Sequence, residues 1–172
     1  MAAIITQATA QEKESVVIGM GEYMISSNPG TVLMCIGLGS CIAVCCYDRL
    51  MKIGGMVHVV LPHHDGPDDG HVGRYANTAV PFLLGQILKN GGIKNRITVK
   101  IAGGAQMTTA PGLRDTFKTG ERNLAEVKAA LEKESIQLAA AETGGSTGRT
   151  VKMYIDTGII TVKTVGGIVR EL

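Results

Sequence analysis

The sequence predicts a single α+β domain, rich in strands, with two main helices gathered on one face of a sheet. Of its 172 residues 45% are apolar, yet it has no Trp, four Tyr and two Phe, so Val, Ile, Leu, Ala and Met must fill the core. The 23 glycines indicate many tight turns. Short apolar runs bounded by turn residues outnumber the two segments of helical periodicity, which is the pattern of an α+β fold.

The first part of the chain predicts four strands. Residues 16–25 alternate loosely between apolar and polar and are followed by Asn28-Pro29-Gly30, a turn cluster. Two short apolar runs then flank a glycine-rich turn, and another follows a turn at residues 48–52. The strands after the first are predicted at residues 31–36, 41–47 and 53–61.

Two segments have helical spacing. Apolar residues within 74–89 recur every three or four positions, and the Asn-Gly-Gly at 90–92 marks a C-terminal end. Pro81 lies inside this pattern, so the helix either begins nearer Asn77 or is kinked. Residues 121–135 carry the clearest amphipathic pattern.

The remainder of the chain predicts a loop and further strands. Residues 107–118 carry few signals and are expected to be irregular. Asp156-Thr157-Gly158 between two apolar runs is a strong hairpin signal. These strands are predicted at residues 96–102, 136–142, 150–155 and 159–165.

Residues 1–15 are expected to be a short disordered lead, and residues 16–172 a single domain. The lead has no basic start and no long apolar run, so it does not indicate a signal peptide. The apolar segment 31–47 is short of the roughly 20 residues that a membrane-spanning helix needs. All four cysteines lie within residues 35–46, too close together for a disulfide framework. We therefore expect free thiols in a reducing cytoplasm.

The charge pattern argues against nucleic-acid binding. The formal net charge is only +2, and no cluster of five or more Lys and Arg residues occurs. A nucleic-acid groove usually shows a basic stripe with aromatic side chains between its charges. Neither feature is present in this sequence.

Gly39-Ser40-Cys41 places a cysteine at the junction between a glycine-rich turn and an apolar run. A thiol in this position can expose its sulfur while the backbone N–H groups around Ser40 and Cys41 hold a developing oxyanion. A thiol with its ordinary pKa of about 8.5 is mostly protonated at neutral pH, so it needs a base close by. The pattern suggests Cys41 as a nucleophile.

His58 is the candidate base, because it lies in the strand predicted to pair with the run that follows Cys41. If the turn is centred near residue 49, Cys41 falls opposite residues 56–58, within reach of the ring. A cysteine in an apolar strand is more often inert core, and a histidine in a strand is more often structural. On the residues alone, the catalytic and the structural interpretations are about equally supported.

The loop after the fourth strand is rich in groups that bind metals. A zinc site would need three or four of them at fixed geometry, but their spacing matches no known ligand pattern and the composition is that of a solvated loop. We therefore expect no metal and no other cofactor. The groups are His63, His64, Asp65, Asp68, Asp69 and His71.

Several motifs occur in order from about Val16 to the C-terminus. They are Gly19-x-Gly21-Glu22-Tyr23, Leu38-Gly39-Ser40-Cys41, Gly54-Gly55-Met56-x-His58-x-x-Leu61-Pro62, Arg74-Tyr75-Ala76, Ala102-Gly103-Gly104-Ala105 and Gly120-x-Arg122-Asn123. Together they closely resemble CheD, the chemoreceptor glutamine deamidase family of bacterial and archaeal chemotaxis. The second and third motifs at this spacing are the specific part of the resemblance.

The resemblance implies a fold, an activity and partners. CheD proteins hydrolyse glutamine side chains of methyl-accepting chemoreceptors to glutamate and release ammonia, and some also hydrolyse glutamyl methyl esters. Their fold is similar to that of cytotoxic necrotising factor-type cysteine deamidases, a single layered α/β/β sandwich. Carried over by motif, Cys41 would be the nucleophile and His58 the base of a thioester mechanism. The implied partners are chemoreceptor cytoplasmic domains and CheC, a phosphatase of the phosphorylated response regulator.

One position departs from the family pattern. A threonine usually stands six residues before the nucleophile, where it is thought to orient the histidine, and here that position is Cys35. A thiol is a weaker hydrogen-bond partner than a hydroxyl. Three outcomes are therefore open: Cys35 orients the ring poorly, a backbone carbonyl replaces it, or activity is reduced.

Two rival functions remain to be weighed. The departure at Cys35 favours a weakly catalytic or non-catalytic adaptor that binds receptors or a CheC-type phosphatase through the same cleft. A thiol redox or metal protein would use the four clustered cysteines, but the Cys-x-x-Cys spacing of thioredoxin-like chemistry is absent from the sequence.

Overall fold

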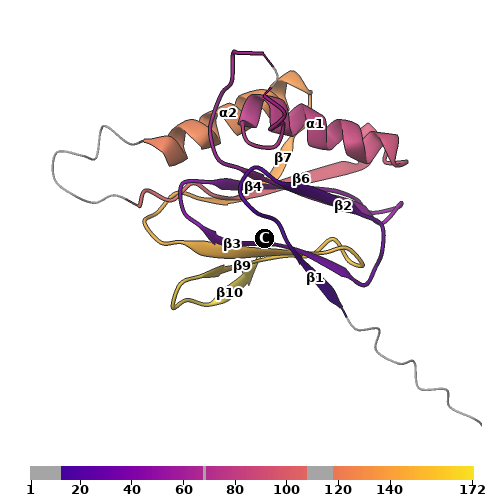
Figure 1. Cartoon of the computed structure of the whole chain (residues 1–172). Helices are drawn as coiled ribbons and strands as arrows, with labels where there is room; N and C mark the ends of the chain where they lie inside the picture. The colour runs from indigo at the N-terminus through magenta and orange to yellow at the C-terminus, as the bar shows by residue number, and fades with distance from the viewer. Residues whose placement is uncertain (1–12, 68, 108–117) are drawn as a thin grey trace, which may run out of the picture.

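The structure, a computed structural model, describes residues 13–67, 69–107 and 118–172. These residues form two α-helices, one short 3-10 helix and ten strands, and the strands make two five-stranded sheets. Figure 1 shows three layers, with both α-helices on one sheet and that sheet packed on the other. We name the sheet beneath the helices the middle sheet and the other the outer sheet.

The middle sheet has the strand order β2-β5-β4-β6-β7. Its neighbours are antiparallel except β6 and β7, which are parallel. Its strands are β2 (Tyr23–Ser26), β4 (Ile42–Asp48), β5 (Ile53–Val59), β6 (Ile97–Gly103) and β7 (Leu138–Thr143). The helices are α1 (Ala76–Lys89), α2 (Thr119–Lys133) and the 3-10 helix η1 (Lys94–Arg96).

The outer sheet has the order β1-β3-β8-β9-β10. Its first pair is parallel and the other pairs are antiparallel. Its strands are β1 (Glu14–Val17), β3 (Thr31–Leu38), β8 (Arg149–Tyr154), β9 (Ile160–Thr164) and β10 (Val169–Glu171).

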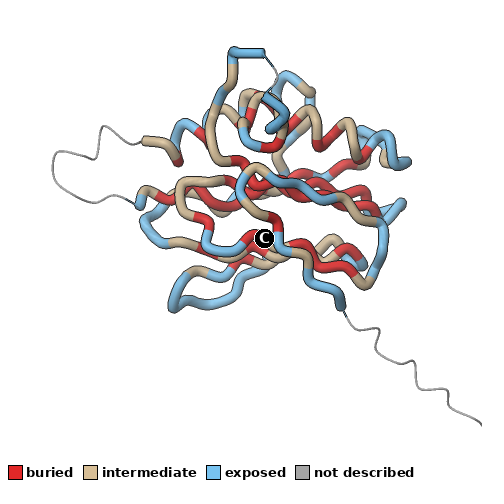
Figure 2. The backbone as a smooth tube through the Cα atoms, viewed as in Figure 1, coloured by how far each residue is buried: buried red, intermediate tan, exposed pale blue. Residues whose placement is uncertain are grey.

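Burial follows from this layering. Every residue of β4 and β5 is buried, because helices cover one face of these strands and the outer sheet covers the other. In contrast, β8 alternates between buried and half-buried residues, since only one of its faces is covered. Figure 2 shows buried residues concentrated in the middle sheet and where the layers meet. One hydrophobic cluster, which includes Leu83 and Val127, lies between the helices and the middle sheet. A second, which includes Leu33 and Met153, lies between the sheets.

The predicted α+β class is confirmed, with both α-helices on one face of a sheet. The hairpin across residues 156–158 is confirmed by the antiparallel pairing of β8 with β9. Pro81 lies within α1, which begins at Ala76 rather than at residue 74. Most of the predicted loop at 107–118 lies outside the described residues. The strand β10 has no counterpart among the predictions.

The prediction of one strand over residues 16–25 is wrong, because β1 and β2 lie there in different sheets. The chain turns between them at residues 18–22, where Gly21 has a φ of +76° that disfavours a side chain. The predicted disordered lead is also too long. Glu14 and Ser15 belong to β1 and pair with Thr31 and Val32, while residues 1–12 lie outside the described part.

The passage from β3 to β4 carries the chain from the outer sheet to the middle sheet. The ladder between β3 and β8 is irregular between Cys35 and Leu38, and Gly37 in this stretch has a φ of +70°. A bulge of this kind bends a strand and ends its regular pairing. The short turn that follows therefore lies where the two sheets meet. Within the described residues, no helix has the length and apolar character required to cross a membrane.

Candidate active site

Cys41 lies at the end of the turn between the two sheets, directly before β4. Its side chain is half-buried and packs against the cluster between the sheets. Burial raises the pKa of the thiol, and the backbone N–H of Cys41 itself, close to the sulfur, opposes this in part. At neutral pH the group is therefore a thiol, and a base is needed to make it nucleophilic.

Two glycines and an alanine at the end of β6 and directly after it hold this turn in place. The N–H of Gly104 donates to the Cys41 carbonyl at 2.8 Å, and that of Ala105 donates to the Gly39 carbonyl at 2.7 Å. Gly103 has a φ of +126°, and a Cβ there would lie 2.1 Å from the Cys41 carbonyl oxygen. Only glycine fits at that position, because backbone approaches backbone without room for a side chain.

His58 lies in β5 and is 5% exposed. The hairpin of β4 and β5 is confirmed, but its register differs from the prediction, because Ala43 rather than Cys41 pairs with His58. Cys41 and His58 nevertheless point to the same face of the middle sheet. Cys41 and Met56 both pack in the cluster between the sheets, and His58 lies two residues after Met56 in β5, on the same face of that strand. Cys41 lies two residues before Ala43, the partner of His58, and is therefore the diagonal neighbour of His58. Long side chains in diagonal positions of an antiparallel pair can reach each other.

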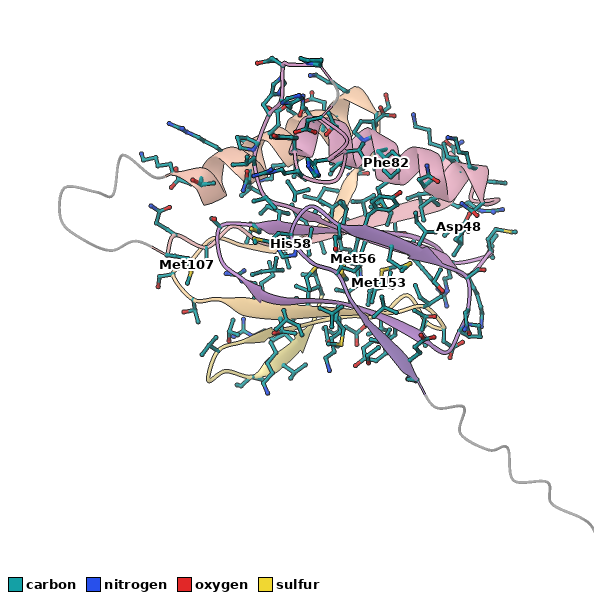
Figure 3. All side chains as sticks on the ribbon, viewed as in Figure 1. Asp48, Met56, His58, Phe82, Met107 and Met153 are labelled. Atoms are coloured by element: carbon teal, nitrogen blue, oxygen red, sulfur yellow. The ribbon has the colours of Figure 1, made fainter. Side chains whose placement is uncertain are left out.

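Figure 3 shows His58 between the two sheets, toward the end at which Met107 lies. Met107 also marks the end that holds the nucleophile turn, since a Cβ on Gly39 would lie 2.8 Å from its side chain. The candidate base and the candidate nucleophile therefore belong to the same end of the sandwich.

The turn at residues 18–22 makes three hydrogen-bond contacts with His58. The ring Nδ1 lies 3.2 Å from the Ile18 carbonyl oxygen. The backbone N–H of His58 donates to the Glu22 carbonyl at 3.0 Å, and its carbonyl accepts from the Gly21 N–H at 2.9 Å. Because a carbonyl can only accept, Nδ1 must carry the proton, and Nε2 is left with a free lone pair.

The environment also keeps the ring neutral. Burial lowers the pKa of His58, and the Ile18 carbonyl and the Glu22 carboxylate oppose this in part. A neutral imidazole with Nε2 unprotonated is the form that accepts a proton from a thiol. His58 is therefore in the protonation state that a general base requires.

Cys35 is fully buried in the cluster between the sheets, and its thiol lies 3.4 Å from the sulfur of Met56. Burial, with a smaller effect of Cys41, raises its pKa to about 12. The ring of His58 has a carbonyl, that of Ile18, as its hydrogen-bond partner. That Cys35 itself orients His58 stays a prediction.

Ser40, predicted to contribute to an oxyanion site, has a partner that was not predicted. Its carbonyl accepts from Nδ2 of Asn123 at 2.9 Å, and the same Nδ2 donates to the Val60 carbonyl at 2.9 Å. Asn123 is fully buried although it lies in α2. Its sequence signal is a polar residue four positions before Val127, on the apolar stripe of that helix.

The four cysteines are free thiols, and the pKa of each is raised, chiefly by burial. Redox-active cysteines usually have a lowered pKa, because the thiolate is the reactive form. The environment of these thiols therefore does not match that of a thiol redox protein.

The loop after β5 contains an ion-pair bridge. Its His63 lies 2.8 Å from Asp65 and 2.9 Å from Glu126 of α2, one carboxylate at each ring nitrogen. The hydrogen bond to Glu126 is the main cause of the raised pKa of His63. No group of three or more His, Cys, Asp and Glu side chains that could hold a metal occurs among the described residues, which omit Asp68.

Comparisons with known proteins agree with one another. Residues 60–164 match a family described as CheD chemotactic sensory transduction. The chain is 44% identical over 151 residues to the chemoreceptor glutamine deamidase CheD of Thermotoga maritima. This match covers 88% of this chain and 92% of the relative.

Two relatives named probable chemoreceptor glutamine deamidase CheD, from Desulfitobacterium hafniense and Pyrococcus abyssi, are each 39% identical to this chain. The matches cover 86% and 90% of this chain and 92% and 94% of the relatives. Identity of this extent over nearly the whole chain shows common descent, and the chain belongs to the CheD family.

Proposed function

We propose that this protein is a glutamine deamidase that converts glutamine side chains of chemoreceptors to glutamate. The names of its relatives support the substrate. The observation that carries the chemistry is the hydrogen bond between His58 Nδ1 and the Ile18 carbonyl, which leaves Nε2 as the acceptor nitrogen of a ring on the face where Cys41 packs, with no Nε2 partner among the described residues.

The first half of the reaction forms a thioester. Nε2 of His58 takes the proton of the Cys41 thiol as the sulfur attacks the carbon of the glutamine side-chain amide. The electron pair of the C=O bond moves to oxygen, and the Cys41 backbone N–H stabilises the oxyanion. The tetrahedral intermediate then collapses, the C–N bond breaks, and His58 returns the proton to the leaving nitrogen, which departs as ammonia.

The second half releases the product. His58 Nε2 removes a proton from water as the water oxygen attacks the thioester carbon. The C–S bond breaks, the proton passes from His58 to the Cys41 sulfur, and the product leaves as the carboxylic acid, which at neutral pH gives its proton to the released ammonia or to solvent and becomes glutamate. One water is consumed and one ammonia is formed, so Cys41 and His58 return to their neutral resting states.

The same proposal extends to substrates and partners. A glutamyl methyl ester has the same acyl group with methanol as the leaving group, so the mechanism applies to it unchanged. A CheC-type phosphatase is the proposed regulatory partner, and the cytoplasmic domains of the receptors are the proposed site of action. The layered fold is proposed to be related to that of cytotoxic necrotising factor-type deamidases, which superposition on a solved toxin structure would check.

A receptor cytoplasmic fragment tests the function. We expect amide-to-acid conversion of specific glutamines, read by peptide mass spectrometry, with the wild-type chain and none with Cys41→Ala. Cys46→Ala is the matched control, because it removes a thiol that faces the helices instead of the outer sheet, and it should retain activity. Conversion by Cys41→Ala would show that another group is the nucleophile. No conversion by the folded wild type would favour the adaptor function.

A further inference from the structure

Asn123 links α2 to two segments of the candidate active site, the turn before β4 and the residue that follows β5. Its Nδ2 donates to the carbonyl of Ser40, the residue before the proposed nucleophile, and to that of Val60, two residues after the proposed base. Both acceptors are carbonyl oxygens, so the amide must present its nitrogen to them. The side chain therefore joins the nucleophile turn to the end of β5 through one rigid group.

The bond to Ser40 determines the direction of another group. Ser40 C=O and Cys41 N–H belong to one planar trans peptide unit, so they point in opposite directions. With the carbonyl held toward α2 by Asn123, the N–H must point away from the helix. The Cys41 N–H and the Cys41 sulfur belong to one residue and are separated by only a few covalent bonds, so the N–H lies close to the reacting sulfur. That is the place where an oxyanion forms when the sulfur attacks a carbonyl.

The helix is fixed against the same turn from its first residues. A Cβ on Gly120 would lie 2.6 Å from the Gly104 carbonyl oxygen, so the backbones of α2 and of the segment after β6 are in contact there. Gly104 in turn donates its N–H to the Cys41 carbonyl. The peptide groups before and after Cys41 are thus both held by partners that pack on each other.

Asparagine is an unexpected choice for a purely structural contact at this position. It disfavours the interior of a helix, and its Oδ1 is buried without a hydrogen-bond partner among the described residues. An unpaired buried acceptor costs free energy that an apolar side chain would not. The position thus retains two donated bonds at the expense of stability.

We propose that Asn123 is a positioning residue that aims the Cys41 N–H at the developing oxyanion. The proposal rests on the proposed role of Cys41 as the nucleophile. Asn123 touches no reacting atom itself. It acts through the Ser40–Cys41 peptide group.

Two reagents separate this role from a general structural one. Acylation of Cys41 by p-nitrophenyl acetate forms a tetrahedral oxyanion, whereas alkylation by iodoacetamide attacks a saturated carbon and forms none. The ratio of the two rate constants, with the modified residue identified by mass spectrometry, therefore reports the oxyanion site alone. Nucleophilicity of the thiol, its access and the position of His58 affect both reactions and cancel in the ratio.

We expect Asn123→Ala to lower this ratio by about tenfold or more, since loss of one oxyanion donor costs about 100- to 1,000-fold and misdirection costs less. Asn123→Leu, nearly isosteric and a better helix former, serves if the alanine variant does not fold. Asn77→Ala is the matched control, because Asn77 also bridges a helix to a loop, with Nδ2 3.0 Å from the His64 carbonyl. Its ratio should equal that of the wild type.

The outcomes are distinct. An unchanged ratio in the folded Asn123 variants, or a parallel fall in both rates, would overturn the proposal and leave Asn123 a structural residue. If neither reagent modifies Cys41 in the wild type, the nucleophile assignment fails and the proposal falls with it. If the ratio falls as expected but receptor glutamines are not converted, the proposed substrate is wrong and the role of Asn123 stands.

Discussion

The two ends of the hairpin of β4 and β5 differ in how their polar side chains are paired. At its closed end, Asp48 is fully buried and each of its carboxylate oxygens is paired. One oxygen accepts from the backbone N–H groups of Leu50 and Met51 at 3.0 and 3.2 Å. The other accepts from the Ile93 N–H at 2.9 Å and from the Arg96 guanidinium at 2.8 and 3.1 Å.

At the open end, Cys41 and His58 are both neutral, and their described partners are largely backbone groups. A charged group with all of its bonds satisfied stabilises the fold but has nothing left to react with. A neutral imidazole whose Nε2 has no partner among the described residues lacks one stabilising hydrogen bond, but this nitrogen can accept a proton. The same two strands thus carry a stability site at one end and a candidate catalytic site at the other.

The largest effect is expected from His58→Ala at the open end. Loss of the general base should lower kcat for deamidation by about 100- to 10,000-fold. The melting temperature should fall as well, since truncating a buried ring leaves a cavity and unpairs the Ile18 carbonyl, but the variant should lack activity at temperatures where it is still folded. Deamidation kinetics and thermal unfolding of the same preparation test this. Retained activity would remove His58 from the mechanism.

Asp48→Asn, at the closed end of the hairpin, should lower stability without lowering the activity of the folded protein. Disrupting a buried carboxylate–Arg96 pair costs about 2 to 4 kcal/mol of stability, discounted because Arg96 is partly exposed. The activity of the folded variant should be unchanged. Asp156→Asn is the control, because its pair with Lys52 at 3.2 Å is exposed and should contribute less than about 1 kcal/mol.

The pH dependence of stability gives an independent reading of Asp48. Burial alone would raise its pKa, but Arg96 and the backbone N–H groups of Ile93 and Met51 lower it to about 2. A lowered carboxyl pKa stabilises the fold above the unfolded value of about 4 and loses that contribution as pH falls toward 2. Denaturant unfolding should show roughly 2 kcal/mol lost over this range in the wild type and not in Asp48→Asn. Equal acid sensitivity of the two proteins would contradict the pairing.

The smallest effect is expected from Cys35→Ala. If the Ile18 carbonyl orients His58, removing the Cys35 thiol should change kcat by less than about threefold, while the lost packing against Met56 lowers stability by about 1 kcal/mol. Steady-state deamidation measures the first quantity and denaturant unfolding the second. A fall in kcat as large as that of His58→Ala would instead make Cys35 the orienting group.

Much of the middle sheet could be predicted from the sequence, because strands covered on both faces are continuous apolar runs. The register of β4 with β5 could not. The prediction centred the turn near residue 49, whereas Asp48 stays in the strand and pairs with Ile53. A charged residue usually marks a turn, and only the later sequence around Ile93 and Arg96 explains its burial here.

The prediction missed the turn at residues 18–22 for a different reason. Gly19 and Gly21 interrupt the predicted strand and were the available signal, but the apolar alternation on either side conceals a change of sheet. In the site, Cys41 and His58 could be recognised by residue type. The Ile18 carbonyl could not, because every residue carries one, and the partner of Ser40 lies 83 positions away in the chain.

These separations have a consequence for the order of folding. The bond between His58 and Ile18 spans 40 residues, and those from Asn123 to Val60 and Ser40 span 63 and 83. Closing such long loops costs more entropy than forming local turns, so distant contacts depend on the rest of the fold being in place. During synthesis on the ribosome, Cys41 and His58 emerge before α2 exists. The chain therefore gains its complete site only when both sheets and the second helix have assembled, and hydrolytic activity becomes a measure of finished folding.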